Sequence, residues 1–161
     1  MHLLTNRLII RPMEPSDWRV VQRISADFAA SPYRYFDHAF SLYDEAIQRL
    51  TANFAKSGLF FSVLLNSEMI GYVCFHDDGG IYDLGFSFLS AYHGKGYAYE
   101  ACTALLDYFA RQGISRFTAG TALENTPSVR LLEKLGFTLV SKEELEFHNG
   151  HPFTGGNYRK G

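Results

Sequence analysis

The sequence lacks most of the features that mark secreted, membrane-bound or nucleic-acid-binding proteins. It has only two cysteines in 161 residues, Cys74 and Cys102, and they form no CxxC pair, so we expect two reduced core residues. No apolar run is long enough to cross a bilayer, and no cleavable leader opens the chain. The net charge is only -2, with acids and bases interspersed, so no basic surface indicates nucleic acid or a membrane. We therefore expect a soluble cytoplasmic protein.

Hydrophobic residues, by contrast, make up 47% of the chain, and neither repeats nor low-complexity tracts divide it. We therefore expect one domain over residues 1–161, built around one core. The spacing of apolar residues predicts a mixed α/β fold in the order β-α-α-β-β-β-α-β-α-β-β. The predicted strands cover residues 5–13, 59–65, 69–75, 81–89, 116–121 and 137–141, and the predicted helices cover 17–31, 42–56, 98–112 and 125–136.

Several local patterns complete the fold prediction. Ser16 or Asp17 is expected to cap the first helix. The apolar faces of the second and fourth helices are expected to consist of Tyr43, Ile47, Leu50 and Phe54, and of Val129, Leu132 and Leu135. Asn149-Gly150 predicts the turn of a hairpin within residues 146–153. The polar, glycine-rich tail TGGNYRKG is expected to lack regular structure.

A glycine-bearing loop, HGKGYA at residues 93–98, joins the strand at 81–89 to the most regular amphipathic helix of the chain. The free N–H groups and the dipole of a helix N-terminus favour anions, and glycines let the backbone come close to one. The loop therefore predicts a phosphate site, although a Gly-x-Gly turn that binds nothing has the same pattern. It is not a nucleotide P-loop, which needs Lys followed by Ser or Thr, nor the dinucleotide fingerprint, which needs a third small residue.

Three segments of the chain resemble the GNAT superfamily of acyl-CoA-dependent N-acetyltransferases. LGFSFLSAYHGKGYAYEA at 84–101 is similar to the central motif of that family, and ENTPSVRLLEKLGF at 124–137 resembles its second motif. NRLIIRPM at 6–13 resembles the opening strand of the RimJ/RimL-like subgroup, named for enzymes that acetylate the N-terminal amines of ribosomal proteins. His93 departs from the Gln or Arg that is commonest at its position. The resemblance implies the GNAT fold, a mixed, mostly antiparallel sheet splayed between the central strand and the following one, flanked by about four helices.

The same resemblance implies that acetyl-CoA lies between the splayed strands, held mostly by backbone atoms. Its pyrophosphate would meet the N–H groups at the start of the central helix, and its pantetheine would pair with the central strand. Lys95 either adds charge or is simply solvated, and Asn125 binds the pantetheine, caps the fourth helix, or does both. The implied cofactor residues are Ser87, Phe88, Leu89, His93, Gly94, Lys95, Gly96, Tyr97, Ala98, Tyr99 and Asn125.

Acetyl transfer needs a neutral amine, a stabilised oxyanion and a proton for the departing thiolate. Asp83 stands where family members often carry a glutamate, and shielding by Tyr82 and Phe86 is expected to make its carboxylate a base for the amine, either directly or through water; alternatively it only attracts a cationic acceptor. A backbone N–H around residues 86–88 is expected to stabilise the oxyanion. Many relatives carry a tyrosine that acts as the acid where this chain has Leu132. In the subgroup a serine has been assigned that role, and it maps onto Ser128. The alternative is that Ser128 only caps its helix.

The acceptor is expected to be a primary amine, either a protein N-terminus or a small molecule. It would enter between the early helices, the C-terminal hairpin and the aromatic segment at 33–40, which is either a pocket wall or a flap packed on the core. His148 and His151, like the run at 76–78, predict no metal. Homodimers are common in the family, so the resemblance admits pairing of two copies. The alternative functions are a non-catalytic acyl-CoA-binding module and a site for another phosphate ligand.

Overall fold

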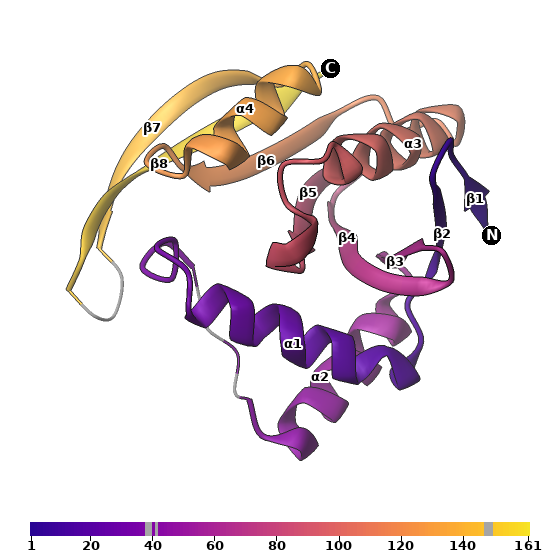
Figure 1. Ribbon diagram of the computed structural model, residues 1–161. Coiled ribbons are helices and arrows are strands. Elements are labelled where there is room, and N and C mark those ends of the chain that lie inside the picture. The colour runs from indigo at the N-terminus through magenta and orange to yellow at the C-terminus, as the bar shows by residue number, and fades with distance from the viewer. Residues whose placement is uncertain (38–39, 41, 147–149) are drawn as a thin grey trace.

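The computed structural model describes residues 1–37, 40, 42–146 and 150–161 of the chain. At its centre is an eight-stranded sheet in the order β1-β2-β3-β4-β5-β6-β8-β7 (Figure 1). The strands are β1 (Leu3–Leu4), β2 (Leu8–Pro12), β3 (Phe60–Leu65), β4 (Glu68–Asp78), β5 (Ile81–Phe88), β6 (Phe117–Ala122), β7 (Thr138–Glu146) and β8 (Pro152–Lys160). Neighbouring strands are antiparallel except β5 and β6, which are parallel because a helix crosses between them. The predicted mixed, mostly antiparallel sheet is confirmed.

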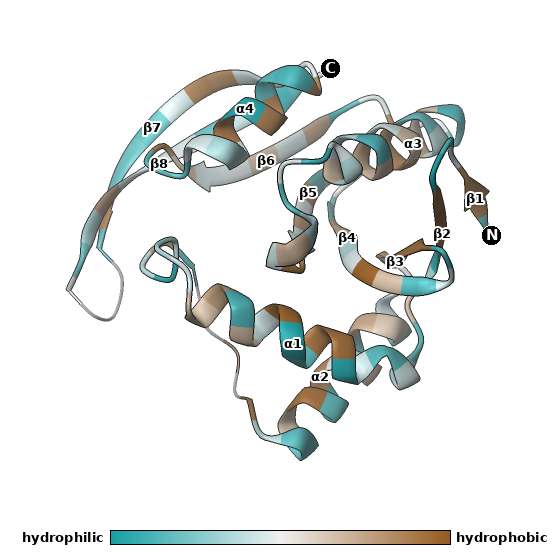
Figure 2. Cartoon of the chain, viewed as in Figure 1, coloured by the Kyte–Doolittle hydropathy of each residue, from teal (hydrophilic) through white to brown (hydrophobic). Residues whose placement is uncertain are grey.

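Helices cover both faces of this sheet. The described residues form α1 (Trp18–Ala29) and α2 (Asp44–Ser57) on one face and α3 (Tyr97–Arg111) and α4 (Thr126–Lys134) on the other, as Figure 1 shows. Short 3-10 helices, η1 (Pro15–Asp17) and η2 (Ser90–Tyr92), precede α1 and α3. Polar and apolar residues alternate in bands along α1 in Figure 2, which is expected of a helix with one buried face. None of the described helices has both the length and the hydrophobicity to span a membrane.

The larger core lies between the sheet and α3. The buried residues of α3 are Ala101, Cys102, Leu105, Leu106 and Phe109, which is the helical period that the sequence predicts. The Phe109 ring lies 5.0 Å from the ring of Phe75 and 5.1 Å from the ring of Tyr82, so α3 packs directly on β4 and β5. Burial raises the pKa of the Cys102 thiol, which keeps it protonated and confirms a core residue. This packing fixes the C-terminal half of α3 against β4 and the start of β5.

The C-terminal tail differs most from its prediction. Residues 152–160 are not irregular but form β8, which lies between β6 and β7 and pairs with both. The glycines that suggested an unstructured tail are needed for close packing, because a Cβ on Gly156 would lie 2.6 Å from Leu123 Cδ2 and one on Gly155 would lie 2.7 Å from Leu145 Cδ1. Tyr158, only 3% exposed, anchors the strand in the core. The turn at Asn149 lies outside the described residues.

Two helix predictions are also wrong in detail. Tyr43 does not belong to the buried face of α2, because it precedes the helix as its N-cap residue and is 82% exposed. The face of α2 that packs on the sheet is centred on Ile47 and Thr51, both fully buried. In α4, Leu132 and the following Leu135 are buried as predicted, but Val129 is only partly buried. In both helices the difference falls at the N-terminal end, although Val129 still packs against the core.

Asp17 occupies the N-cap position of α1, as the sequence predicted, but its side chain makes no capping hydrogen bond to that helix and instead joins η1 to the sheet. Its carboxylate oxygens accept hydrogen bonds from Arg11 Nη1 and Nη2 at 2.8 and 2.9 Å, from the Ser62 hydroxyl at 2.8 Å and from the Glu14 N–H at 2.9 Å. Burial alone would raise the pKa of Asp17, but these hydrogen bonds and the charge of Arg11 outweigh burial and lower it. The local pattern suggested only a cap and gave no sign of these contacts, because Arg11 and Ser62 belong to strands of the sheet.

Asp17→Asn is expected to destabilise the protein by about 3 kcal/mol at neutral pH, because it leaves the half-buried Arg11 without its charged partner. The stabilisation due to the ionised carboxylate is present above the pKa of an unfolded Asp, about 3.9, and is lost as the pH falls through the lower native value. Urea unfolding should therefore show a smaller difference between variant and wild type at about pH 3 than at about pH 7. The exposed Asp107→Asn serves as the control, and equal stability of Asp17→Asn and wild type at neutral pH would contradict the prediction.

Candidate active site

Strands β5 and β6 pair at one end only. Among the described residues their register consists of two positions, Tyr82 with Phe117 and Asp83 with Thr118, although β5 continues to Phe88 and β6 to Ala122. Beyond these positions each strand pairs only with its outer neighbour, β5 with β4 and β6 with β8. The sheet therefore opens between its two parallel strands, and both strands end at the open side.

The backbone of β5 presents hydrogen-bonding groups to this opening. The Tyr82 N–H donates to the Arg116 carbonyl at 3.1 Å, so the even-numbered residues of β5 turn their backbone groups toward β6. By the same alternation the N–H groups of Phe86 and Phe88 face the opening, whereas the Leu89 N–H is already bonded to the Ile70 carbonyl at 2.9 Å. An extended ligand can thus pair with β5 at residues 86 and 88.

Asp83 lies at the closed end of the opening, on the sheet face that carries α1 and α2. Its side chain is exposed, and its Oδ1 accepts a hydrogen bond from the Thr118 hydroxyl at 2.7 Å. The predicted shielding by Tyr82 and Phe86 is wrong, because strand alternation sends those rings to the opposite face, into the α3 core. A polar acceptor can therefore reach Asp83 without displacing the rings of Tyr82 and Phe86.

An open pocket of about 280 Å³ lies beside Asp83. It is lined by Ser57, Leu59, Phe60, Cys74, Phe75, His76, Asp77, Asp83 and Gly85. His76 is the cross-strand partner of Asp83, so two polar side chains from neighbouring strands share this face. Burial, with a smaller contribution from the Asp83 charge, raises the pKa of Cys74 to about 12, so its thiol is not a nucleophile at neutral pH.

The glycine-bearing loop lies at the open end of the same gap. Gly94 and Gly96 have φ angles of +73° and +83°, a region that residues with a side chain rarely adopt. Gly96 is the N-cap residue of α3, and the first N–H bonded within the helix is that of Glu100, to the Gly96 carbonyl at 3.0 Å. The N–H groups of residues 97–99 therefore remain at the helix end, where the dipole favours an anion.

The polar side chains of the loop mostly bind the loop itself. His93 Nε2 donates to the Phe88 carbonyl at 2.8 Å, which closes the turn between β5 and α3. Lys95 Nζ donates to the Ala91 carbonyl at 3.3 Å. Tyr97 packs edge-on against Tyr92, and the Lys134 ammonium of α4 lies 4.1 Å from the centre of the Tyr99 ring. The groups of this loop that remain available to an anion are thus mainly backbone N–H groups.

Asn125 and Ser128 lie at the start of α4, just after β6. The Asn125 N–H donates to the Ala122 carbonyl at 3.0 Å, and the Asn125 side chain accepts a weak hydrogen bond from the Ser128 N–H at 3.4 Å. Asn125 is therefore a helix cap, and the half-buried Ser128 occupies the first turn. About 13 Å of strand separates Thr118 from Ala122, so Asp83 and Ser128 approach the gap from different ends and do not touch.

These features agree with known proteins. A family model described as an acetyltransferase (GNAT) domain matches residues 7–138. The chain belongs to the GNAT acetyltransferase family. It is therefore an acyltransferase, of the N-acetyltransferase kind, and the resemblance seen in its sequence motifs is confirmed.

Individual relatives of this GNAT chain agree in sequence and fold. The uncharacterized N-acetyltransferase YnaD of Bacillus subtilis (strain 168) is 33% identical over 141 residues, which cover 84% of this chain and 82% of the relative. A GNAT-family acetyltransferase from Bacillus anthracis superposes with a TM-score of 0.85 at 29% identity, covering 99% of this chain and 97% of that one. RimL, a ribosomal-protein alpha-N-acetyltransferase in complex with coenzyme A, has the same fold, with a TM-score of 0.85 at 19% identity over 98% and 96% of the two chains.

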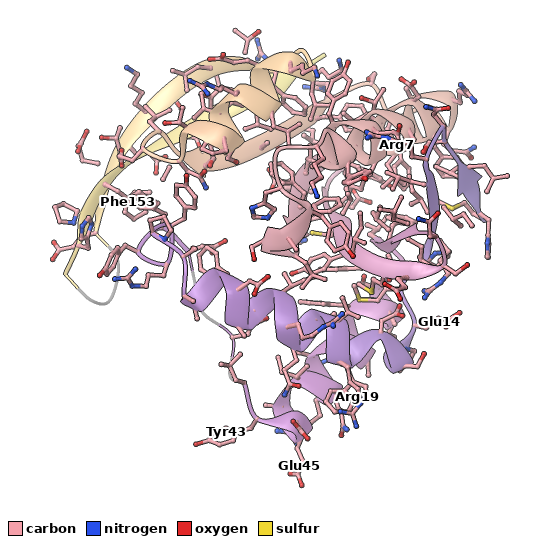
Figure 3. All side chains as sticks on the ribbon, in the orientation of Figure 1. Arg7, Glu14, Arg19, Tyr43, Glu45 and Phe153 are labelled. Carbon is pink, nitrogen blue, oxygen red and sulfur yellow. The ribbon has the colours of Figure 1, made fainter. Side chains whose placement is uncertain are left out.

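The aromatic segment after α1 packs on the C-terminal hairpin of the GNAT fold. Tyr35 stacks on His151 with ring centres 4.6 Å apart, and Phe36 lies 5.5 Å from Phe153, which Figure 3 labels. The contact joins the segment after α1 to the start of β8. His148 lies outside the described residues, and no group of three His, Cys, Asp or Glu side chains gathers for a metal in the described part of the chain.

Arg7 is the site residue that sequence reasoning missed. Its guanidinium lies against the glycine-bearing loop and donates to the Lys95 carbonyl at 3.0 Å. The motif around residues 6–13 indicated the family but gave no spatial information, because Lys95 is 88 residues further along the chain. Only the pairing of β2 into the sheet brings the two together.

Proposed function

We propose that the protein is an acetyl-CoA-dependent N-acetyltransferase that acts as a single domain and moves an acetyl group to a primary amine by direct attack on the thioester. The observation that carries this proposal is the parting of β5 and β6 beyond Asp83 and Thr118, with the glycine-bearing loop and the start of α3 at its open end. A long, extended acyl-donor molecule with an anionic group fits such a gap. The groups that would donate hydrogen bonds to it are backbone N–H groups, which the fold already holds in place.

In this proposal the pyrophosphate of acetyl-CoA meets the N–H groups at the start of α3, within the motif residues 93–99. The pantetheine pairs with the backbone of β5 at Phe86 and Phe88, and Asn125 contacts the same arm while capping α4. One of the two β5 N–H groups also stabilises the oxyanion formed on the thioester carbonyl, since such donors act best when held rigidly by the fold. The support is the alternation of β5 and the bond from Tyr82 to Arg116.

The amine is proposed to approach from the face of α1 and α2. Asp83 removes its proton through a water molecule, because the exposed carboxylate is already oriented by Thr118 and lies at the closed end of the gap. The nitrogen attacks the thioester carbon, the C–S bond breaks, and the thiolate receives a proton from the Ser128 hydroxyl, which regains one from water as the proton taken up by Asp83 returns to solvent. Leu132, at the position of the tyrosine acid of many relatives, is only 1% exposed and carries no proton to give. The acceptor is a peptide N-terminus, like that of the ribosomal-protein enzymes, or a small amine.

The direct test of this function measures CoA release with a panel of amines: peptides that begin with Ser or Ala, polyamines, amino sugars and amino acids. Turnover on at least one class, together with saturable acetyl-CoA binding, is the expected result. Binding of acetyl-CoA without turnover on any amine would instead indicate a non-catalytic acyl-CoA-binding module. Absence of acetyl-CoA binding would contradict both functions.

Ser128→Ala is expected to lower kcat about tenfold, because the thiolate must then leave without a nearby proton donor. The hydrogen bond from the Ser128 N–H to the Asn125 side chain is kept in this variant, so the cap of α4 and the stability of the fold should not change. Steady-state rates across the pH range, with thermal unfolding measured alongside, check the prediction. Unchanged turnover at every pH would make Ser128 a purely structural residue.

A further inference from the structure

Arg7, which lies just before β2, contacts the start of α3 in three ways. Its Nη1 donates to the Lys95 carbonyl at 3.0 Å and its Nε to Glu100 Oε1 at 3.3 Å. The centre of its guanidinium also lies 4.4 Å from the centre of the Tyr97 ring. Figure 3 labels Arg7 between β2 and α3. All three contacts fall on the loop and first turn where the donor phosphates are proposed to bind.

The contact with Lys95 determines the direction of a backbone donor. Lys95 lies between two glycines with positive φ, and the N-cap residue Gly96 has no side chain with which to cap α3. In a trans peptide the C=O and N–H groups point in opposite directions, so holding the Lys95 carbonyl toward Arg7 turns the Gly96 N–H away from it. Arg7 also lies against Gly96, since a Cβ there would be 3.3 Å from Arg7 Nη2. The Gly96 N–H is thus directed before any ligand arrives.

The contact with Glu100 removes a repulsion. Glu100 lies in the first turn of α3, and a bare carboxylate there would oppose the binding of a phosphate at the same helix end. Its side chain is 18% exposed and is bound on both oxygens, Oε1 by Arg7 and Oε2 by the Thr5 hydroxyl at 3.2 Å. The positive charge of Arg7 therefore offsets the negative charge of Glu100 in the first turn of α3.

We propose that Arg7 is a positioning residue for the pyrophosphate of the acyl donor. It orients the Lys95–Gly96 peptide and neutralises Glu100, and it touches none of the reacting atoms. The inference rests on the proposed acetyl-CoA-dependent function. It means that Arg7 affects only donors that carry the pyrophosphate, because a truncated thioester such as S-acetylpantetheine has no group for the loop to bind.

The test compares kcat/KM for acetyl-CoA and for S-acetylpantetheine with the best amine of the panel. Arg7→Met is expected to lower the value for acetyl-CoA about tenfold, mainly through KM, and to leave the value for S-acetylpantetheine unchanged. Arg7→Lys keeps the positive charge beside Glu100 but cannot make the three contacts at once, so it is expected to show a smaller loss than Arg7→Met, again only with acetyl-CoA. Arg111→Met, at the exposed C-terminal end of α3, removes the same charge and should keep the wild-type ratio.

The quantity that decides is the ratio of kcat/KM for acetyl-CoA to kcat/KM for S-acetylpantetheine. A wild-type ratio in Arg7→Met or in Arg7→Lys would overturn the inference. An equal loss with both donors would also overturn it, because it would mean that Arg7 only supports the fold. Circular dichroism and thermal unfolding identify a variant that does not fold, and Arg7→Lys then carries the test. Failure of the proposed function is distinct, because the wild-type protein itself would then neither bind nor use acetyl-CoA.

Discussion

Replacing Asp83 by asparagine is expected to lower kcat about 100-fold while leaving the Kd for acetyl-CoA unchanged. The carboxylate lies at the closed end of the gap on the acceptor face, whereas the proposed donor contacts lie along β5 and at the start of α3. The amide keeps the size of the side chain and the hydrogen bond from Thr118, so the loss isolates the proton-accepting role. Steady-state kinetics and a binding titration measure the two quantities separately.

The pH dependence of this variant distinguishes a base from a mere attractor of cations. With a peptide acceptor, the α-amino group becomes neutral in solution as the pH rises above about 8, and a general base is then no longer needed. The difference in kcat between Asp83→Asn and wild type should therefore become smaller with rising pH if Asp83 is the base. Asp78→Asn removes the same charge from the exposed end of β4 and should behave like wild type. If the variant instead differs from wild type only in the KM of the amine, and by the same factor at every pH, Asp83 only attracts a cationic acceptor.

Gly96→Val is expected to weaken acetyl-CoA binding about 100-fold, the second large effect. Gly96 has a φ of +83°, which costs a β-branched residue about 1–3 kcal/mol, and relaxing this strain would turn the N–H groups of the loop out of line. The new side chain would also press on Arg7 Nη2, 3.3 Å from its Cβ position. Isothermal titration with acetyl-CoA gives the change in Kd directly.

The matched control lies at the other end of the same helix. Gly113 has a φ of +98° with nothing within 4 Å of its Cβ position, so Gly113→Val suffers similar backbone strain away from the site. It should lose stability in thermal unfolding but keep the wild-type Kd for acetyl-CoA. Equal weakening of binding by both variants would mean that general destabilisation, and not the loop, accounts for the effect of Gly96→Val.

The helices and central strands were predictable because local periods reflect which side of an element is buried. The stripe from Ala101 to Phe109 repeats at helical spacing, and α3 forms there with the same residues buried. The parallel pairing of β5 and β6 followed from the helix between them. Predictions failed where a distant partner outweighs the local pattern, as at Asp17, whose side chain binds Arg11 and Ser62 from two strands instead of hydrogen-bonding to the first turn of α1.

By itself the sequence determined the family, the order of most elements and the place of the glycine-bearing loop before α3. These depend on residues close together in the chain: two glycines before a helix, a capping residue before Pro127, and regular apolar periods. Only the tertiary structure decided which face of the sheet Asp83 occupies, that the tail becomes β8, and that Arg7 holds the loop at Lys95. Those features arise when segments far apart in sequence are brought together by burial of a common core, so no local pattern encodes them.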